Sequence, residues 1–480
     1  MSQPIVTRFA PSPTGFMHIG SARTALYAYL WAQKCGGTFI LRIEDTDKSR
    51  EVPGSIEHIE ETLGWLGLTY DFGPRTPGPW GSNIQSERLD TYRAAAEQLY
   101  KKGLAYPDPF TKEELDALRA QAEAEKRAFL VRDYRPETTA VWDGTRALRF
   151  KHTKLERSVW TDAVRGELSA GPEALDDFVI LKADGYPTYN FAHIVDDAAM
   201  GVTHVVRGDE FIASTPNYLA LYDALGIPRP VFVTVPPILK DDRTKKLGKR
   251  DGAKDILEYR KEGYLRDAMN NYLALLGWNP GTDQEVFTME ELVAQFEIDR
   301  IHVSGAAFNE TKLQWINREH MLKLSPHLFW EHAEEFLTPE TVTLLDAKNL
   351  WSQVVPLMRE RASTFSDIGV LDREGEYRHY YEAPSPDPSK LCWKEESQVA
   401  TKARLEAILG LLEGVSDPWT VDAVKAAVWD YAEKEGKGQV LWPMRVALSG
   451  KDKSPDPFVI AGIIGRDETL ARIRAACSVL

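Results

Sequence analysis

The pattern of apolar and polar residues changes period several times along the first hundred positions. "IVTRF" is a stretch of β-branched and aromatic residues that is typical of a short strand, whereas Leu26, Tyr29 and Leu30 recur at helical spacing. The pattern predicts strands over residues 4–9 and 38–45, and helices over residues 21–35, from Ser55 and from near Ser86. Strands that alternate with helices predict a parallel sheet with right-handed crossovers.

Residues 107 to about 175 interrupt this alternation. They open with "PDPF", continue with a capping box at Thr111 and Glu114 that predicts a helix, and include short strand-like pieces such as "ALRFKH". The alternation then resumes with "FVILKADGYPTYNFAHIV", "HVVRGDE", a helix from Thr215 to Leu225 and the strand "PVFVTV". The pattern therefore indicates a sheet that an inserted domain interrupts and that is completed afterwards.

Strand signals nearly stop after about residue 253. Helical periodicity dominates from there, for example in "GYLRDAMNNYLALLGW" and "VDAVKAAVWDYAEKE", and a proline-rich connection covers residues 382–390. The predicted fold class is therefore α/β, with a parallel-sheet domain, an inserted α+β domain and an all-α C-terminal half.

Length and composition limit the class of protein. A chain of 480 residues has room for about three domains, and no apolar stretch approaches the roughly 20 residues of a membrane span. The N-terminus has neither a basic lead nor an apolar signal core, and Cys35, Cys392 and Cys477 are isolated from one another. We therefore expect a cytoplasmic protein with no membrane partner, no disulfide framework and no zinc site.

The net charge of −14 argues against a protein that is coated in nucleic acid, but one segment has the opposite sign. "KDDRTKKLGKR", residues 240–250, holds six basic and two acidic residues. The segment is either a local grip for an anionic partner or a solvated loop, which is the common role of a run of charges.

The stretch "PSPTGFMHIGSA", residues 11–22, lies between the first predicted strand and helix. In an open parallel sheet such a junction lies at the edge where ligands bind. Gly15 and Gly20 would let the backbone approach a phosphate, and the helix start near Ser21 offers unpaired N–H groups. His18 is then placed to reach an anionic oxygen; the alternative is a purely structural histidine in a turn.

The motifs resemble those of one family along nearly the whole chain. "TRFAPSPTGFMHIGSARTALYAYLWA" and "GGTFILRIEDTDKSR" are similar to the opening of bacterial-type glutamyl-tRNA synthetases of class I, with "HIGS" at the position of their HIGH signature. "KKLGKRDGA" stands where the KMSKS loop of the family lies, and "GQVLWPMRVALSG" continues the resemblance near the C-terminus. The resemblance implies ATP-dependent attachment of L-glutamate to the 3′ end of tRNA(Glu) through a glutamyl-adenylate, by a monomer that uses ATP with Mg²⁺; tRNA(Gln) stays open as a second substrate.

The resemblance also divides the chain. It implies a Rossmann-like catalytic domain in two halves, an inserted acceptor-end-binding domain, a segment that combines the KMSKS loop with a helical stem-contact domain, and a helical anticodon-binding region. These correspond to residues 1–106 and 177–239, 107–176, 240–324 and 325–480.

The site residues that the resemblance implies fall into three groups. The groups that would bind ATP are Pro11, Ser12, Gly15, His18, Gly20, Ser21, Ile238, Leu239 and Lys249, with His18, Lys246 and Lys249 stabilising the charge that develops on phosphate. The glutamate pocket would comprise Arg8, Ser12, Glu44, Tyr189, His193 and Arg207; the role of His193 stays open because the family carries several polar residues there. Arg359 and Arg361 stand where the family can read an anticodon base, and a solvated helix face is the alternative for both.

One structural alternative and two departures from the family remain. Arg8 and Glu44 could form a structural ion pair rather than bind substrate. Ser21 replaces the last histidine of the HIGH signature, and Gly248 replaces a common serine, which removes a hydroxyl donor from the loop. These departures favour a rival from another class, a non-catalytic tRNA-binding protein, whereas the joint presence of His18, Lys246 and Lys249 favours an enzyme. A smaller nucleotidyltransferase and a truncated synthetase relative that modifies tRNA bases would both lack the long helical C-terminal half.

Overall fold

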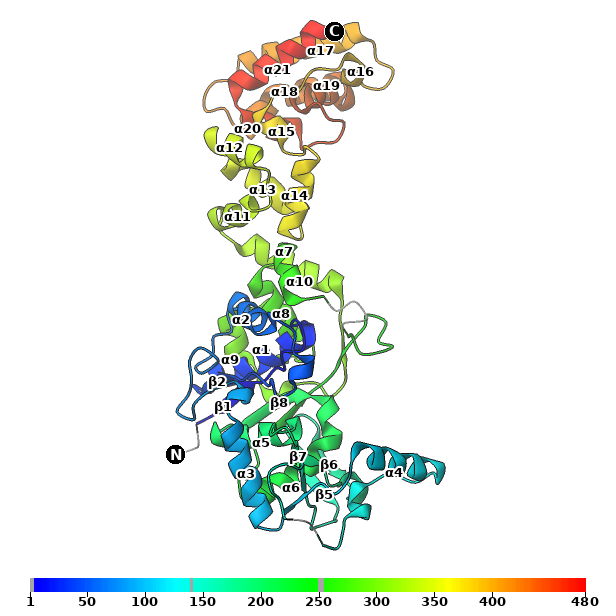
Figure 1. Cartoon of the computed structure of the whole chain (residues 1–480). Coiled ribbons are helices and arrows are strands. Elements are labelled where there is room, and N and C mark those ends of the chain that lie inside the picture. The colour runs from blue at the N-terminus through cyan, green and yellow to red at the C-terminus, as the bar shows by residue number, and fades with distance from the viewer. Residues whose placement is uncertain (1–3, 139–140, 249–253) are drawn as a thin grey trace. The chain divides into compact units, whose positions relative to one another are not determined.

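The computed structural model describes residues 4–138, 141–248 and 254–480 (Figure 1). The chain divides into two compact units. The first comprises residues 1–260 and 265–316, and the second comprises residues 261–264 and 317–480.

A mixed sheet forms the centre of the first unit. Its strand order is β2-β1-β8-β9-β5-β6, and every neighbouring pair is parallel except β5–β6. The strands are β1 (Val6–Phe9), β2 (Thr38–Leu41), β5 (Ser158–Asp162), β6 (Gly166–Ala170), β8 (His204–Gly208) and β9 (Val231–Val235). The predicted Rossmann-like α/β class with a helical C-terminal half is confirmed.

In the part of the chain that the structure describes, the first unit also contains eight α-helices and parts of two more. Those of the first unit are α1 (Ile19–Lys34), α2 (Ser55–Leu66), α3 (Leu89–Lys101), α4 (Lys112–Ala124), α5 (Tyr189–Ala199), α6 (Thr215–Leu225), α8 (Arg266–Leu275) and α9 (Met289–Gln295). Two further helices contain boundaries between the units, α7 (Ile256–Lys261) and α10 (Glu310–Lys323). The short strands β10 (Ile238–Leu239) and β11 (Ala306–Ala307) pair in parallel.

The strands within and beside the inserted segment belong to two different sheets. β3 (Ala105–Pro107), β4 (Leu148–Phe150) and β7 (Val179–Leu181) make an antiparallel sheet. The strand expected at "FVIL" therefore forms, but it pairs with β4 and not with the parallel sheet. β5 joins the parallel sheet at Asp162, whose carboxylate accepts from the Thr234 backbone N at 3.1 Å and from its Oγ1 at 2.6 Å. The partner of each strand is decided by contacts between residues far apart in sequence, so the local hydrophobic pattern cannot predict it.

Side-chain caps set several helix starts. The capping box at Thr111 and Glu114 opens α4, as predicted. α1 begins at Ile19, two residues before the predicted start, because His18 is its N-cap and accepts a hydrogen bond from the Gly20 backbone N–H.

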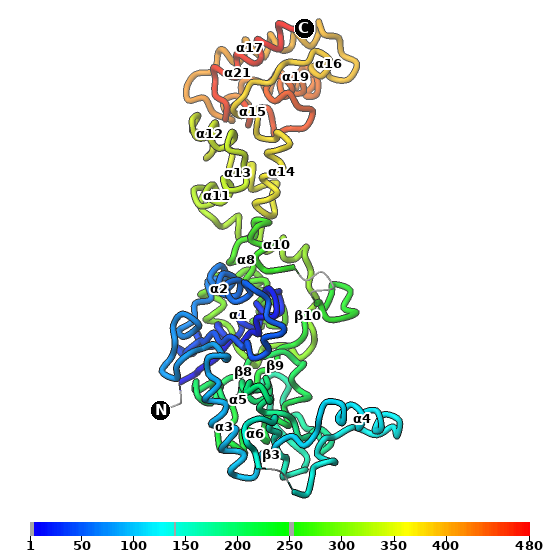
Figure 2. The backbone as a smooth tube through the Cα atoms, in the orientation of Figure 1, coloured from blue at the N-terminus to red at the C-terminus, as the bar shows by residue number. Residues whose placement is uncertain are grey.

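The second unit is helical, as the periodicity predicts (Figure 2). Its helices are α11 (Pro326–Glu334), α12 (Pro339–Ala347), α13 (Trp351–Arg361), α14 (Phe365–Arg373), α15 (Arg378–Tyr381), α16 (Pro388–Leu391), α17 (Gln398–Glu413), α18 (Val421–Glu435), α19 (Lys437–Ser449), α20 (Pro457–Ile464) and α21 (Arg466–Val479). Within the described residues, no helix combines the length and apolar character needed to cross a membrane.

Candidate active site

A cavity of about 540 Å³ opens at the carboxyl ends of β1 and β8. These strands are neighbours, and the next strand in sequence lies to one side of β1 and to the other side of β8. Such a reversal of strand order is where open α/β sheets bind ligands. The described residues that line the cavity include, from the predicted set, Arg8, Pro11, Ser12, His18, Gly20, Ser21, Glu44, Tyr189, Arg207, Ile238 and Lys246.

His18 lies at the edge of this cavity with its ring orientation set by the helix that it caps. The Gly20 N–H donates to His18 Nδ1 at 3.1 Å, so in the neutral ring the proton is on Nε2, which lies 3.5 Å from Ser21 Oγ. A Cβ on Gly20 would stand only 3.0 Å from the imidazole Cε1, which explains the glycine. Gly15 has a φ of +139°, a conformation that other residues rarely adopt, but it does not line the cavity.

Arg8 and Glu44 both reach the cavity, but they do not pair with each other. Arg8 Nε lies 3.1 Å from Asp197 Oδ1, and Glu44 Oε1 lies 3.0 Å from Arg42 Nη2. The structure therefore does not contain the Arg8–Glu44 ion pair that was the structural alternative. Among the described residues, nothing donates a hydrogen bond to the second Glu44 oxygen, Oε2, so this atom could accept a bond from a ligand.

Arg42 connects these charges beneath the cavity. Its guanidinium is fully buried and also lies 2.7 Å from Asp197 Oδ1. Burial raises the pKa of Glu44 to about 7, against the opposing effect of Arg42 and Arg8. Burial would raise the pKa of Asp197 as well, but the two arginines outweigh it and hold that pKa at about 2. The network thus keeps Asp197 ionised, while Glu44 titrates near neutrality.

Arg207 is a buried cation without a carboxylate partner among the described residues. It is only 6% exposed and donates to Thr215 Oγ1 at 2.9 Å. The rings of Phe211, Tyr218 and Phe232 surround its guanidinium at 5.0–5.5 Å. Burial lowers its pKa, since a desolvated charge is costly. An anionic ligand in the cavity would relieve that cost.

Tyr189 and His193 occupy different layers. Tyr189 lines the cavity, and the His193 ring stacks behind it at 4.8 Å and does not line the cavity. The His193 Nδ1–H donates to the Tyr189 carbonyl at 2.7 Å, whereas Nε2 has no hydrogen-bond partner among the residues that the structure describes. Burial lowers the pKa of His193 to about 3, so the ring is neutral at physiological pH.

The basic segment borders the same cavity through Lys246, Leu247 and Gly248. Lys246 Nζ lies 3.0 Å from Glu210 Oε2. Leu239 does not line the cavity; it pairs through its backbone with Lys246. The predicted residue Lys249 lies outside the described residues.

Arg359 and Arg361 end helix α13 in the second unit. Arg359 is not a freely solvated side chain: it donates to the Leu324 carbonyl at 2.7 Å and lies 4.8 Å from the centre of the Phe329 ring. Arg361 is exposed and forms an ion pair with Glu376.

Sequence reasoning missed Arg42 and Asp197, which organise the buried charges. A signal existed for both. Arg42 and Glu44 are two residues apart after a strand, a spacing that places side chains on one face. Asp197 is one of two adjacent carboxylates in the mostly apolar "FAHIVDDAAM".

The sheet has an α/β architecture with a cavity at its reversal point, and a helical C-terminal unit follows it. Comparisons with known families specify the class further. Residues 4–315 match the profile described as "tRNA synthetases class I (E and Q), catalytic domain", and residues 328–477 match "Anticodon binding domain". The chain belongs to the class I tRNA synthetases for glutamate and glutamine.

Individual relatives agree with this family. A glutamate–tRNA ligase of Clostridium novyi (strain NT) is 41% identical over 478 residues, which cover 98% of this chain and 96% of the relative. A crystal structure of a glutamate tRNA ligase from Elizabethkingia meningosepticum in complex with its amino acid superposes with a TM-score of 0.85 at 35% identity, over the full length of both chains. The glutamate–tRNA synthetase of Elizabethkingia anophelis gives a TM-score of 0.81 at 34% identity, over 99% of this chain and 100% of that one.

Proposed function

We propose that this chain attaches L-glutamate to the 3′ end of tRNA(Glu) in protein biosynthesis, through a glutamyl-adenylate made from ATP. The observation that carries the proposal is that Arg8, Arg207 and Glu44 line the same cavity as His18. The family membership and the names of the relatives support the same activity. The cavity provides two cations and one anion for a ligand that itself carries two carboxylates and one ammonium group.

The amino-acid subsite takes its selectivity from charge. Arg207 and Arg8 face the side-chain carboxylate of the substrate, and Glu44 Oε2 accepts from its ammonium group. A guanidinium donates two parallel hydrogen bonds to a carboxylate, and the amide of glutamine would turn N–H groups towards one of these donors. Ser12 and Tyr189 complete the subsite, and His193 supports Tyr189 from behind.

The ATP subsite lies along the turn and the basic segment. His18 Nε2–H and the backbone near Ser21 donate to phosphate oxygens, with Pro11, Ser12, Gly15 and Gly20 shaping the turn. Ile238 and Leu239 frame the adenine through their backbone. ATP enters with Mg²⁺ as the counter-ion of its phosphates.

The reaction then has two displacements. An oxygen of the glutamate α-carboxylate attacks the α-phosphorus of ATP, and pyrophosphate leaves. Lys246 exchanges its contact with Glu210 for the departing phosphate oxygens, and Lys249 acts with it. A ribose hydroxyl at the 3′ end of tRNA next attacks the acyl carbon, an ester forms and AMP leaves. The side chains act by neutralising and positioning charge.

The same proposal assigns the rest of the chain. Residues 107–176 bind the acceptor end, residues 240–324 carry the KMSKS loop and contact the stem, and residues 325–480 read the anticodon, with Arg361 and Arg359 as candidate contacts. Residues 1–106 and 177–239 form the catalytic domain. The enzyme acts as a cytoplasmic monomer without zinc, and tRNA(Gln) is a possible second substrate.

Aminoacylation tests the proposal directly. The purified chain is given glutamate or glutamine with each of the two purified tRNAs, and ATP–pyrophosphate exchange is measured with tRNA present. Glutamate, and not glutamine, should be attached to tRNA(Glu), and the result with tRNA(Gln) decides the second substrate. Binding of tRNA(Glu) without any ATP–pyrophosphate exchange would instead support the alternative that Ser21 and Gly248 favour, a non-catalytic tRNA-binding protein.

A further inference from the structure

One imidazole connects the turn that carries His18 to the chain that follows the basic segment. His58 lies on α2, with 10% of its side chain exposed, and its Nε2 lies 2.7 Å from Asp255 Oδ2. The Met17 backbone N–H donates to the other ring nitrogen, Nδ1, at 3.4 Å. Phe16 stacks on the ring at a centroid distance of 4.5 Å. Three segments that are distant in sequence therefore meet at one side chain.

The hydrogen bonds determine which nitrogen of His58 carries the proton. A backbone N–H can only donate, so Nδ1 accepts and the proton of the neutral ring is on Nε2. Nε2–H therefore donates to the Asp255 carboxylate. The other carboxylate oxygen, Oδ1, accepts from the Leu257 backbone N–H at 3.0 Å, at the start of α7. The carboxylate of Asp255 is thus held from two directions.

Main-chain contacts join the same two segments. His18 and Asp255 form an isolated antiparallel bridge, and the Ile256 N–H donates to the Met17 carbonyl at 3.1 Å. Asp255 is therefore fixed beside the N-cap of α1 by its backbone and by its side chain. Neither His58 nor Asp255 lines the cavity.

We propose that His58 and Asp255, the His58–Asp255 clasp, are positioning residues for the ATP half of the reaction. The clasp holds Asp255, five residues beyond the end of the basic segment, against the turn that presents His18. This inference rests on the proposed function, because it concerns the ATP subsite. The glutamate subsite depends on Arg8 and Arg207, which lie on β1 and β8, and on Glu44, three residues beyond β2. None of the three contacts the clasp, so its loss should weaken the use of ATP and leave glutamate binding intact.

The test compares His58→Ala, Asp255→Ala and the double variant by ATP–pyrophosphate exchange with tRNA(Glu), with KM measured separately for ATP and for glutamate. Each single variant should lower kcat/KM for ATP by about tenfold, since small displacements in an active site carry large rate costs. The double variant should be no worse than the single ones, because both remove one contact. Asp255→Asn keeps an oxygen that can accept from Nε2–H, so it should recover part of the loss.

A matched control comes from the same helix. Glu60 on α2 pairs with exposed Arg75 at 2.8 Å, and Arg75→Gln should change neither KM. Unfolding temperatures establish that each variant is folded, and Asp255→Asn serves as the milder variant if an alanine variant is not. Three results would each overturn the proposed role of the clasp. They are unchanged ATP kinetics in folded single variants, a parallel rise in KM for ATP and for glutamate, and additive losses of activity in the double variant. A wild-type chain without glutamate-dependent exchange would instead overturn the proposed function on which the clasp rests.

Discussion

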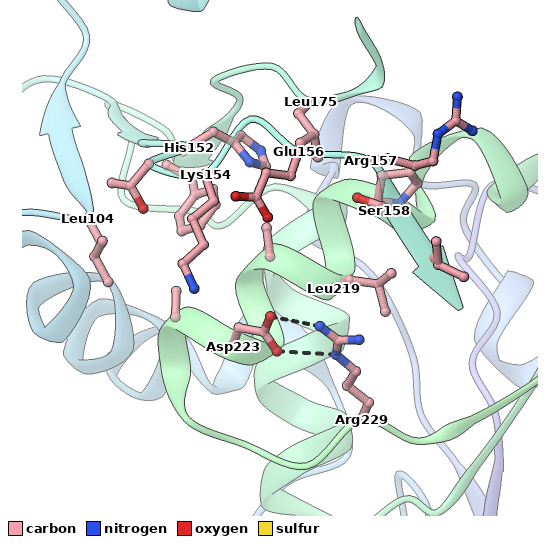
Figure 3. Close-up of a pocket in the computed structure, with 16 residues that line it drawn as sticks. Leu104, His152, Lys154, Glu156, Arg157, Ser158, Leu175, Leu219, Asp223 and Arg229 are labelled. Carbon is pink, nitrogen blue, oxygen red and sulfur yellow. Dashed lines mark hydrogen bonds and ion pairs between the residues drawn. The ribbon is translucent and has the colours of Figure 1, made fainter. Parts of the chain in front are cut away.

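The first unit contains a second cavity of nearly the same volume as the candidate active site, and the two differ in what they do with charge. The second cavity measures about 560 Å³ and lies between α6 and the chain around β4 and β5 (Figure 3). Its Asp223 and Arg229 form a bidentate, exposed ion pair on the wall, and Lys154 extends into the space. The candidate active site, in contrast, contains the buried Arg207 with no carboxylate partner in the described part of the chain.

The volume of a cavity therefore does not identify a binding site, whereas a buried charge without a counter-charge does. An exposed ion pair contributes little to folding and needs nothing from a ligand. Keeping a charge buried without a partner costs free energy, and a protein retains such a group where a ligand supplies the counter-charge. Substitutions in the candidate active site should therefore affect activity far more than substitutions in the second cavity.

Replacement of His18 should have the largest effect. His18→Ala should lower kcat for ATP–pyrophosphate exchange by about 10²- to 10³-fold, the usual loss for one donor to developing charge. Because His18 also caps α1, the alanine variant should lose about 1 kcal/mol of unfolding free energy. His18→Asn separates the two roles, since asparagine can cap the helix; it should restore the stability but not the exchange rate. Unchanged exchange in His18→Ala would remove the phosphate-binding role.

The two arginines should differ from each other. Arg207→Gln should raise KM for glutamate by about 100-fold and reduce selection against glutamine, because Arg207 has no other described counter-charge. Arg8→Gln should weaken the same selection by a smaller factor, because Asp197 already neutralises part of the Arg8 charge. Competition between the two amino acids in the exchange assay measures both factors. Wild-type discrimination in either variant would count against its role in carboxylate recognition.

Glu44 should make glutamate binding depend on pH. As pH falls through about 7, Glu44 takes up a proton and can no longer pair with the substrate ammonium, so KM for glutamate should rise between pH 8 and pH 6. Since the folded pKa lies above the ordinary value, this group stabilises the fold at low pH, and its contribution is lost as pH rises through 7. Glu44→Gln should bind glutamate weakly at every pH in this range. A variant with the wild-type pH profile would assign the titration to another group.

The second cavity should give the smallest effect. Asp223→Asn breaks the ion pair with Arg229, and the unfolding free energy should change by about 1 kcal/mol or less. KM for ATP and for glutamate should stay at their wild-type values. A large loss of exchange activity in this variant would show that the second cavity takes part in the reaction. The two cavities would then not differ in function.

Local pattern was enough to predict much of the fold and part of the site. The helix from Thr215 to Leu225 has the predicted bounds, and the capping box at Thr111 is present, because both depend on residues within a few positions of one another. The turn at residues 11–22 was recognisable because its glycines, its histidine and the strand and helix beside it are contiguous. The order of the motifs along the chain was enough to indicate the family.

Which charged side chains and which strands pair with each other depends on the tertiary structure. Asp197, and not Glu44, pairs with Arg8 across 189 positions of sequence, and β7 pairs with β4 instead of joining the parallel sheet. Burial, which sets the pKa of Glu44 and leaves Arg207 without a described carboxylate partner, arises only when these elements pack together. Hydrophobic periodicity and helix caps depend on residues close together in sequence, so they can be read from the sequence directly. The desolvation of a side chain and the pairing of charges or strands depend instead on which distant segments pack together and exclude water.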